Sequence, residues 1–178
     1  MKIITNTAAK PVRGQGKTLV WGIHPFPGQK ILVAKDDQGL CWLGINCGFS
    51  ALEKNWPAAT FLRDDKATAK LARDITKCWP HKLDTLSVPL VLTGTPFQIS
   101  VWKQLLKIKS GTTVTYQDIA KKIGKPDAVR AVGSAVGKNP LSIVVPCHRV
   151  VNKTGGRINF AWGPKIKIAL LKGEGAMH

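Results

Sequence analysis

The sequence predicts an α/β domain followed by a mainly helical domain that contains a helix-turn-helix. The first half alternates short apolar segments with two helical patterns, whereas the second half carries three helical patterns separated by glycine turns. Positive charge is also unevenly spread, with 14 basic and 3 acidic side chains in residues 94–178. We therefore expect a small α/β domain over residues 1–93 and a separate helical domain over 94–178.

The chain as a whole is strongly basic: 27 Lys and Arg against 10 Asp and Glu give a net charge of +17. This excess suggests a polyanionic partner such as nucleic acid, with an unspecialised basic surface as the alternative. No apolar run approaches the roughly 20 residues that cross a bilayer. Because the start, Met1–Asn6, also lacks the apolar core of a secretion signal, we expect an intracellular, cytoplasmic protein with no membrane partner.

The four cysteines are Cys41, Cys47, Cys78 and Cys147. In a reducing compartment, free thiols are the expected state. Cys78 and His81 have the spacing of a zinc-ligand pair, but no second closely spaced pair exists. We expect structural cysteines and no metal; a zinc site completed by His24, Cys41 or Cys47 is the alternative.

The first half is predicted to contain a hairpin, two helices and a strand. These are a hairpin of residues 30–34 and 40–45, a short helix with a Ser50–Glu53 capping box that stops at Pro57, a helix from Asp64 to Pro80, and a strand over 86–92. Thr93-Gly94 is the expected linker. This half shows no recognisable catalytic constellation.

The second half is predicted to contain three helices. The first begins at Thr95-Pro96-Phe97-Gln98 and closes at Gly111, the second begins at Thr115-Tyr116-Gln117-Asp118, and Gly124 turns the chain into a third that ends at Gly137. Helix, glycine turn and helix form the helix-turn-helix pattern, which often merely joins packed helices. The charge of this half favours DNA binding.

The third of these helices is unusual, because residues 127–136 are nearly all small except for Arg130 in the middle. Small side chains permit close approach, so the helix could lie deep in a groove of a duplex while Arg130 projects from it. The alternative is a helix packed in a core, where Arg130 would be unusual without an acidic partner.

Residues 141–145 are apolar and indicate a buried strand that runs into Pro146-Cys147-His148-Arg149. A thiol of ordinary pKa, about 8.5, needs a base or positive charge nearby to act as a nucleophile. His148 and Arg149 supply candidates. Since adjacent residues on a strand face opposite sides, His148 would need a bent backbone or a bridging water to reach Cys147. On spacing alone the pair is weak evidence for catalysis.

Together these motifs closely resemble the O6-alkylguanine-DNA alkyltransferase family, also called methylated-DNA–protein-cysteine methyltransferases. The resemblance extends from Thr95 to Glu174 and rests on Thr95-Pro96-Phe97-Gln98 with Val101-Trp102, Thr115-Tyr116, Ala128-Val129-Arg130-Ala131-Val132-Gly133, Asn139-Pro140 and Pro146-Cys147-His148-Arg149-Val150. It implies a winged helix-turn-helix domain that enters the minor groove of DNA, preceded by a ribonuclease-H-like α/β domain.

The resemblance also implies a function, which is DNA repair by direct damage reversal. A flipped-out O6-alkylguanine in double-stranded DNA would transfer its alkyl group, mainly methyl, irreversibly to Cys147; O4-alkylthymine is a second expected substrate. A thioether has no easy leaving group, so each copy, expected to be a monomer, would act once. No cofactor is expected, because the damaged base is itself the donor and no nucleotide-binding motif is present.

The family's roles map onto this chain residue by residue. Cys147 would accept the alkyl group, and His148 would activate the thiol through a water. Glu174 would orient His148, and Asn139 would brace the turn. Tyr116 would help rotate the nucleotide and would protonate the departing guanine.

The resemblance also implies the DNA contacts, which are expected from Tyr116, Gln117, Ala128, Arg130, Ala131, Gly133, Ser134 and Arg149. Among them, Arg130 would fill the space that the flipped base leaves in the stack. The pocket is expected to comprise Val150, Phe160, Ala161 and Trp162, with backbone groups near Cys147 and Val150 reading the guanine edge. Glu174, the only acid in the last fifty residues, could instead be a charge near a loose C-terminus.

The chain departs from the family in one loop, where Phe160-Ala161-Trp162-Gly163 replaces the Tyr-Ser/Ala-Gly-Gly of many members. We expect Trp162 to narrow the pocket, so that methyl is accepted and large groups such as benzyl are disfavoured. A place for Trp162 in the hydrophobic core is the alternative.

Three other functions compete with this interpretation. A non-enzymatic damage sensor shares the fold but typically lacks the cysteine, so Cys147 with His148 and Glu174 favours the enzyme. A repair-coupled transcription regulator would carry a four-cysteine zinc cluster, which this sequence does not contain. A cysteine hydrolase would explain neither the charge nor the small-residue helix.

Overall fold

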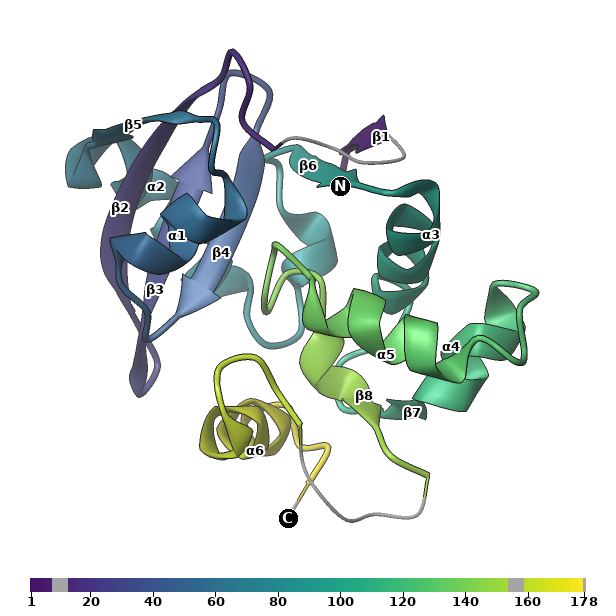
Figure 1. Ribbon diagram of the computed structural model, residues 1–178. Coiled ribbons are helices and arrows are strands. Elements are labelled where there is room, and N and C mark those ends of the chain that lie inside the picture. Colours follow the sequence, from purple (N-terminus) through teal and green to yellow (C-terminus); the bar gives the residue numbers. More distant parts are fainter. Residues whose placement is uncertain (8–12, 154–158, 178) are drawn as a thin grey trace. The chain divides into compact units, whose positions relative to one another are not determined.

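The computed structural model describes residues 1–7, 13–153 and 159–177. The chain divides into two compact units, Met1–Thr95 and Pro96–His178, whose elements are labelled in Figure 1. Among the described residues, no helix combines the length and the apolar character needed to cross a membrane.

The first unit is built on a mixed six-stranded sheet. Its strands lie in the order β1 (Ile3–Thr7), β6 (Leu90–Gly94), β4 (Leu40–Ile45), β3 (Gln29–Lys35), β2 (Thr18–Phe26) and β5 (Thr60–Arg63). β2, β3 and β4 pair antiparallel, whereas β1 with β6, β4 with β6, and β2 with β5 are parallel. The central strands β4 and β6 are buried along their whole length, as expected for strands covered on both faces.

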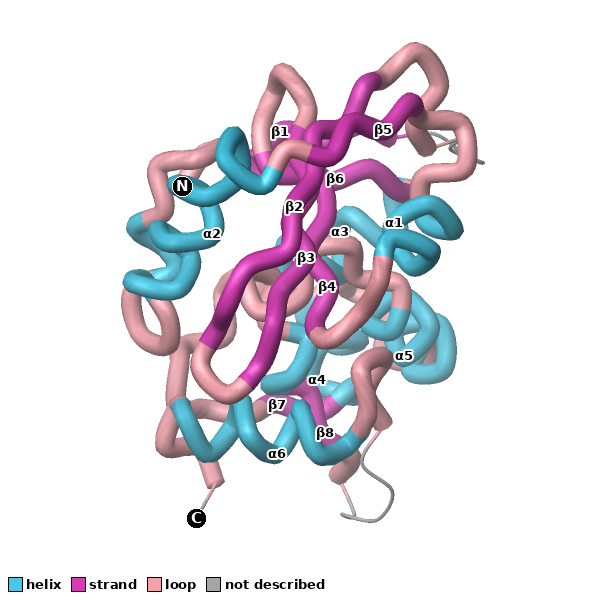
Figure 2. Tube along the Cα trace, turned by 90° about the vertical axis from the view of Figure 1, so that its left-hand side faces the viewer, coloured by secondary structure: helices cyan, strands magenta, loops and turns pink. Residues whose placement is uncertain are grey.

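Two helices cover this sheet. α1 (Phe49–Asn55) and α2 (Asp65–Cys78) lie on opposite faces of it, as the two views show (Figures 1 and 2). A short 3₁₀ helix, η1 (Leu83–Thr85), precedes β6. α2 turns its apolar side inward, so that Leu71, Ala72 and Ile75 are buried.

The predicted hairpin and the predicted start of α2 near Asp64 are confirmed. β3 and β4 pair antiparallel, and the side chain of Asp64 accepts a hydrogen bond from the amide of Ala67 at 2.8 Å. Other predictions for this unit are wrong. The N-cap of α1 is Gly48, with no capping side chain. The strand expected from residue 86 begins at Leu90, and the expected linker Thr93-Gly94 forms its last residues.

The second unit is mainly helical. Its elements are α3 (Pro96–Leu105), β7 (Val114–Thr115), α4 (Tyr116–Lys122), α5 (Val129–Gly137), η2 (Cys147–Arg149), β8 (Val150–Val151) and α6 (Pro164–Gly173). α3, α4 and α5 pack against one another, and the fully buried Trp102 of α3 donates its indole N–H to the carbonyl of Ala135 at 2.8 Å. β7 and β8 pair in parallel.

The three predicted helices are present, with shifted ends. α3 stops at Leu105 instead of continuing to Gly111, and α5 begins at Val129. The side chain of Thr115 accepts from the amide of Asp118, and Asp118 accepts in return from the amide of Thr115, which completes a capping box. Gly124 has a φ of 71°, a conformation that suits glycine in the turn between α4 and α5.

This capping box fixes the end of α4 that carries Tyr116. Thr115→Ala removes the acceptor for the Asp118 amide and should lower the free energy of unfolding by about 1 kcal/mol. Thr115→Ser keeps the hydroxyl and should remain within about 0.5 kcal/mol of the wild type. Urea denaturation measures both, and equal stability of the alanine variant would contradict a stabilising cap.

Candidate active site

The segment before Cys147 is a buried turn, not the expected strand. Residues 141–145 fold back on themselves, with the amide of Val145 donating to the carbonyl of Leu141 at 2.8 Å. Ile143 is fully buried and has a φ of 71°, which costs a β-branched residue on the order of 1–3 kcal/mol. The surrounding contacts must therefore hold this turn in place.

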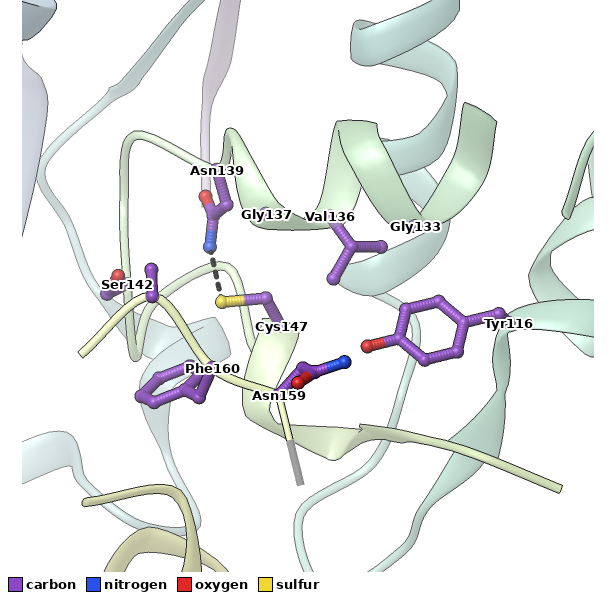
Figure 3. Close-up of a pocket in the computed structure, with 10 residues that line it drawn as sticks. Tyr116, Gly133, Val136, Gly137, Asn139, Ser142, Cys147, Asn159 and Phe160 are labelled. Atoms are coloured by element: carbon purple, nitrogen blue, oxygen red, sulfur yellow. Dashed lines mark hydrogen bonds between the residues drawn. The ribbon is translucent and has the colours of Figure 1, made fainter. Parts of the chain in front are cut away.

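Asn139 supplies several of those contacts. Its Nδ2 donates to the carbonyl of Val145 at 2.7 Å, and its Oδ1 accepts from the amide of Leu141 at 3.0 Å. Nδ2 also lies 3.0 Å from Sγ of Cys147 as a donor (Figure 3). One side chain thus fixes both the turn and the thiol.

Cys147 and His148 lie in the single 3₁₀ turn η2, which provides the bent backbone that this pair requires. His148 is fully buried. Its Nε2 forms a 2.9 Å hydrogen bond with Oε1 of Glu174, whereas its Nδ1 is buried and has no hydrogen-bond partner among the described residues. Nδ1 is therefore the nitrogen free to take a proton.

Glu174 is buried between two partners. Besides His148 it binds Arg149, whose Nε and Nη2 donate to the two carboxylate oxygens at 2.9 and 2.8 Å. Burial by itself raises the pKa of Glu174, but the hydrogen bonds from His148 and Arg149 outweigh this and lower it to about 2. The carboxylate is ionised at neutral pH. The alternative of a loose terminal charge does not fit this burial.

Arg149 does not suit the DNA-binding role expected of it. It is 6% exposed, and its Nη1 donates to the carbonyl of Ile108 while its other nitrogens hold Glu174. A guanidinium engaged in this way is a structural partner of the carboxylate. The guanidinium of Arg149 is therefore not available for the expected contact with DNA.

Burial sets the resting protonation of the acceptor and its neighbour. It lowers the pKa of His148 and outweighs the opposing effect of Glu174, so the imidazole is neutral and can act as a base. Burial likewise raises the pKa of the Cys147 thiol, opposed by the N–H of Asn139 and the charge of Lys167. The thiol is thus protonated at rest and needs this base.

A pocket of about 240 Å³ opens beside the sulfur, somewhat below the roughly 300–1,000 Å³ of sites for drug-sized ligands. It is lined by Tyr116, Gly133, Val136, Gly137, Asn139, Ser142, Cys147, Asn159, Phe160 and Ala161. The hydroxyl of Tyr116 points into the space beside Cys147 (Figure 3). Burial raises the pKa of Tyr116, and Cys147 adds to the effect, so the phenol keeps its proton.

Only part of the expected pocket set lines this pocket. Phe160 and Ala161 do, whereas Val150 and Trp162 do not. Val150 is fully buried. Trp162 is half-buried, so it is not a core residue, and its indole N–H donates to Oγ of Ser142 at 2.6 Å. Trp162 therefore acts on the pocket indirectly, by binding the pocket residue Ser142. This bond connects the loop that carries Trp162 to the turn of residues 141–145.

α5 presents two different faces. Val132, Ala135 and Val136 are buried, whereas Arg130, Ala131 and Ser134 are exposed and Ala128 and Gly133 lie in between. Gly133 faces the ring of Tyr116. Gln117 uses its amide within the fold, donating to the carbonyl of Pro126 at 3.0 Å. The small residues and Arg130 thus lie where another molecule can reach them.

The sequence analysis missed several residues of this site. Ser142 and Asn159 line the pocket, and Lys167, which is 3% exposed, donates to the carbonyl of Asn159. Lys167 could have been found, because it shares a helical spacing with Leu170, Leu171 and Glu174 and therefore lies on the apolar side of α6.

The remaining cysteines offer no comparable site. Buried Cys41 donates from Sγ to the carbonyl of Ala34, and Cys78 lies 3.8 Å from the hydroxyl of Thr85. Within residues 1–7, 13–153 and 159–177, no three His, Cys, Asp or Glu side chains are grouped to hold a metal ion.

Comparisons with known proteins agree with this geometry. Residues 96–176 match the family model described as 6-O-methylguanine DNA methyltransferase, DNA binding domain. The chain is 38% identical over 159 residues to the inducible methylated-DNA–protein-cysteine methyltransferase of Bacillus subtilis, covering 86% of this chain and 89% of the relative. The chain belongs to the methylated-DNA–protein-cysteine methyltransferase family.

Other members give the same result across most of the chain. The Methanosarcina barkeri methylated-DNA–protein-cysteine methyltransferase is 40% identical over 156 residues, covering 88% of this chain and 97% of that protein. The Mycobacterium tuberculosis OGT solved in complex with DNA is 32% identical, with a TM-score of 0.68 over 89% of this chain and 92% of that chain. The similarity therefore includes the first unit, in which the sequence analysis found no motif of the family.

The buried carboxylate of this family member should make its stability depend on pH. A pKa of about 2 in the folded state against 4.5 in the unfolded chain is equivalent to about 3 kcal/mol. Because the folded pKa is the lower one, this contribution is present above about pH 4.5 and is lost as the pH falls through about 2. Glu174→Gln should lose it at neutral pH, as urea denaturation can measure.

The exposed Asp127 provides the matched control. Asp127→Asn should change the free energy of unfolding by less than about 0.5 kcal/mol. If the free energies of unfolding of Glu174→Gln and the wild type fell in parallel on acidification, the ionised carboxylate of Glu174 could not contribute the stability assigned to it.

Proposed function

We propose that this protein repairs alkylated DNA by direct damage reversal, moving an alkyl group from O6 of guanine to Sγ of Cys147. The observation that carries the proposal is the placement of that sulfur. It lies at the wall of a pocket, 3.0 Å from the Asn139 amide, and is followed by His148, which is buried against Glu174. Family membership supports the chemistry, since the relatives are named as methyltransferases that act from methylated DNA onto a protein cysteine.

The reaction begins with the loss of the thiol proton. We infer that a bridging water carries it from Cys147 to Nδ1 of His148, the nitrogen that lacks a protein partner among the described residues. Glu174 holds the opposite nitrogen at 2.9 Å and stabilises the imidazolium that forms. Cys147, His148 and Glu174 thus correspond to the nucleophile, base and acid of a hydrolase triad, except that the nucleophile attacks an alkyl carbon instead of a carbonyl carbon.

Transfer then forms the Sγ–carbon bond as the carbon–O6 bond breaks. The electron pair of that bond passes to the guanine, and a ring nitrogen of the base takes the proton of the Tyr116 hydroxyl. The proton on His148 returns to the phenolate through solvent. In the balance, Cys147 exchanges hydrogen for an alkyl group and the guanine gains that hydrogen. No cofactor enters this balance.

The product is a thioether, which offers water no leaving group. Each copy of the protein therefore acts once, and repair is stoichiometric. Every group assigned to the chemistry comes from Pro96–His178 of one chain, so we propose that the monomer is the active form.

DNA binding is assigned to α4 and α5, as a helix-turn-helix that the parallel pair β7–β8 supports as a wing. Ala131 and Ser134 would let α5 lie close to the backbone in the minor groove, with Ala128, Gly133 and Gln117 at its edge. Arg130 would fill the stack after Tyr116 helps rotate the damaged nucleotide out of it. The relative solved with DNA supports nucleic acid as the partner; a duplex that carries O6-alkylguanine, and O4-alkylthymine as a further substrate, are our proposals.

We further propose that the chain has two domains, the first with a ribonuclease-H-like fold. The boundary predicted between residues 93 and 94 moves to Thr95 and Pro96, because Gly94 still pairs with Thr7 in the sheet. The order β4-β3-β2-β5 supports this assignment, because an antiparallel meander is extended by a parallel strand with helices on both faces. The first unit has no assigned role in the transfer.

The central test uses a duplex that contains O6-methylguanine. The intact protein mass should rise by one methyl group, and peptide mapping should place it on Cys147. Cys147→Ser should abolish the gain while keeping salt-sensitive binding to the duplex. Tight lesion binding without any mass gain in the wild type would identify a damage sensor and exclude the proposed transfer.

The loop that holds Trp162 should restrict the size of the alkyl group. The rate of transfer from O6-benzylguanine in the same duplex should be at least about tenfold lower than that from O6-methylguanine. The reason is that the 2.6 Å hydrogen bond from Trp162 fixes Ser142 and the loop beside the sulfur. Trp162→Gly should reduce the difference between the two rates, as single-turnover kinetics can measure.

Trp162→Phe is the matched control, because it keeps a ring but removes the N–H donor. If the bond to Ser142 restricts the pocket, the phenylalanine variant should behave like the glycine variant. Equal rates on benzyl and methyl substrates in the wild type would refute the size restriction.

A further inference from the structure

The outer side of α2 is a basic surface that the proposed transfer does not use. Its four exposed cations are Lys66, Lys70, Arg73 and Lys77, which we call the basic stripe. Because neighbours in the stripe are three or four residues apart, all four lie within about 60° of one another around the helix axis. The buried residues of α2 lie on the opposite side, and they are Thr68, Leu71, Ala72 and Ile75. The basic stripe therefore points away from the sheet.

The acids of α2 compensate little of this charge. Asp74 pairs with Lys70 at 2.7 Å, whereas Asp65 is bound by Arg63, which lies outside the stripe. Among the ion pairs found in the described parts of the chain, none includes one of the other three stripe residues. These three cations face solvent without a carboxylate.

The basic stripe is unfavourable for the helix itself. Its neighbours are like charges at i,i+3 or i,i+4, and such pairs destabilise a helix. Lys66 also lies in the first turn of α2, at the positive end of the helix dipole, where a cation is unfavourable. A face that served only solubility would intersperse charges of both signs. A ligand that is itself a row of negative charges accounts for this arrangement.

We propose that the basic stripe of α2 is a second DNA-binding surface, which contacts the phosphate backbone of a duplex without reading its sequence. The choice of DNA as the polyanion rests on the proposed function, since a protein that repairs a base in a duplex works among duplex phosphates. The first unit then has a role of its own. It adds affinity for undamaged DNA, on which the protein must stay while α4 and α5 search for the lesion.

The dimensions of the basic stripe suit a duplex backbone. From Lys66 to Lys77 the helix rises about 16 Å, a length over which each strand of a duplex presents roughly five phosphates. The small residues Ala67 and Ala69 flank the stripe, so the helix can approach a backbone closely. Contacts of this kind hold a protein on DNA but carry no sequence information.

The first test is the salt dependence of binding to an unmodified duplex, measured by fluorescence anisotropy. The combined substitutions Lys66→Gln, Arg73→Gln and Lys77→Gln should reduce the slope of log K against log salt by about 2 to 3, because each lost phosphate contact removes about 0.9. Binding at about 0.1 M salt should weaken at least about tenfold.

The matched control replaces three exposed lysines elsewhere in the first unit, Lys2, Lys30 and Lys54, with glutamine. Both combinations remove three positive charges, so the control measures the effect of net charge alone. It should change the slope by less than about 1. Equal slopes in the two combined variants would overturn the proposal.

Urea denaturation of the stripe variant excludes misfolding as the reason for weaker binding. Glutamine has nearly the helix propensity of lysine and arginine, and the substitutions remove the like-charge pairs. The midpoint should therefore equal or exceed that of the wild type. A lower midpoint would show that the stripe stabilises α2 and would contradict the proposal.

A second measurement needs no substitution. Lysine acetylation by an N-hydroxysuccinimide ester, followed by peptide mass spectrometry of the wild type, should be at least about threefold slower at Lys66 and Lys77 when the unmodified duplex is bound, because phosphates cover these side chains. Acetylation of Lys30 and Lys54 should keep its rate. Unprotected Lys66 and Lys77 in the complex would overturn the proposal.

Neither measurement depends on alkyl transfer. A wild-type protein whose stripe is protected by DNA but which gains no methyl group from O6-methylguanine would refute the proposed function and keep the second surface. A protein that gains the methyl group at Cys147 without protection of the stripe would refute the second surface alone.

Discussion

The carboxylate of Glu174, buried against His148 and Arg149, is the interaction on which the site depends. It connects the end of α6 to η2, and through Arg149 to the carbonyl of Ile108 beyond α3. The hydrogen bonds from His148 and Arg149 keep the carboxylate ionised, and an ionised carboxylate fixes which nitrogen of His148 remains available. A single buried charge thereby determines both the packing of the C-terminal helix and the direction in which a proton can leave the thiol.

Burial acts in opposite directions on the acid and the base of this site, and both effects serve the same end. It raises the pKa of Cys147 and lowers that of His148, so both groups are neutral at rest. A neutral thiol beside a neutral imidazole is less exposed to adventitious electrophiles than a permanent thiolate would be. For a protein that acts once, protecting the acceptor before it meets its substrate is a direct advantage.

The sequence predicted elements with local signals and missed those that depend on distant pairing. The start of α2 after Asp64 and the turn at Gly124 are encoded within a few residues, and both were predicted. β1 and β2 were not predicted, because a parallel partner far along the chain stabilises β1, while Gly22 and Pro25 interrupt the pattern of β2. In the site, the apolar run 141–145 suggested a strand; the positive φ of Ile143 and the bonds from Asn139 make it a turn.

Two sets of hydrogen bonds hold the segments around the pocket in place, and neither involves His148 or Glu174, the groups that handle the proton. The indole of Trp162 binds Ser142, and the ammonium of Lys167 binds the carbonyls of Val150 and Asn159. The carboxylate of Glu174 is held separately by His148 and Arg149, so a change in the loop can alter the space beside the sulfur while the pair of His148 and Glu174 stays as it is. The alkyl groups that a member of this family accepts can therefore diverge through residues such as Trp162 while the chemistry at Cys147 remains the same.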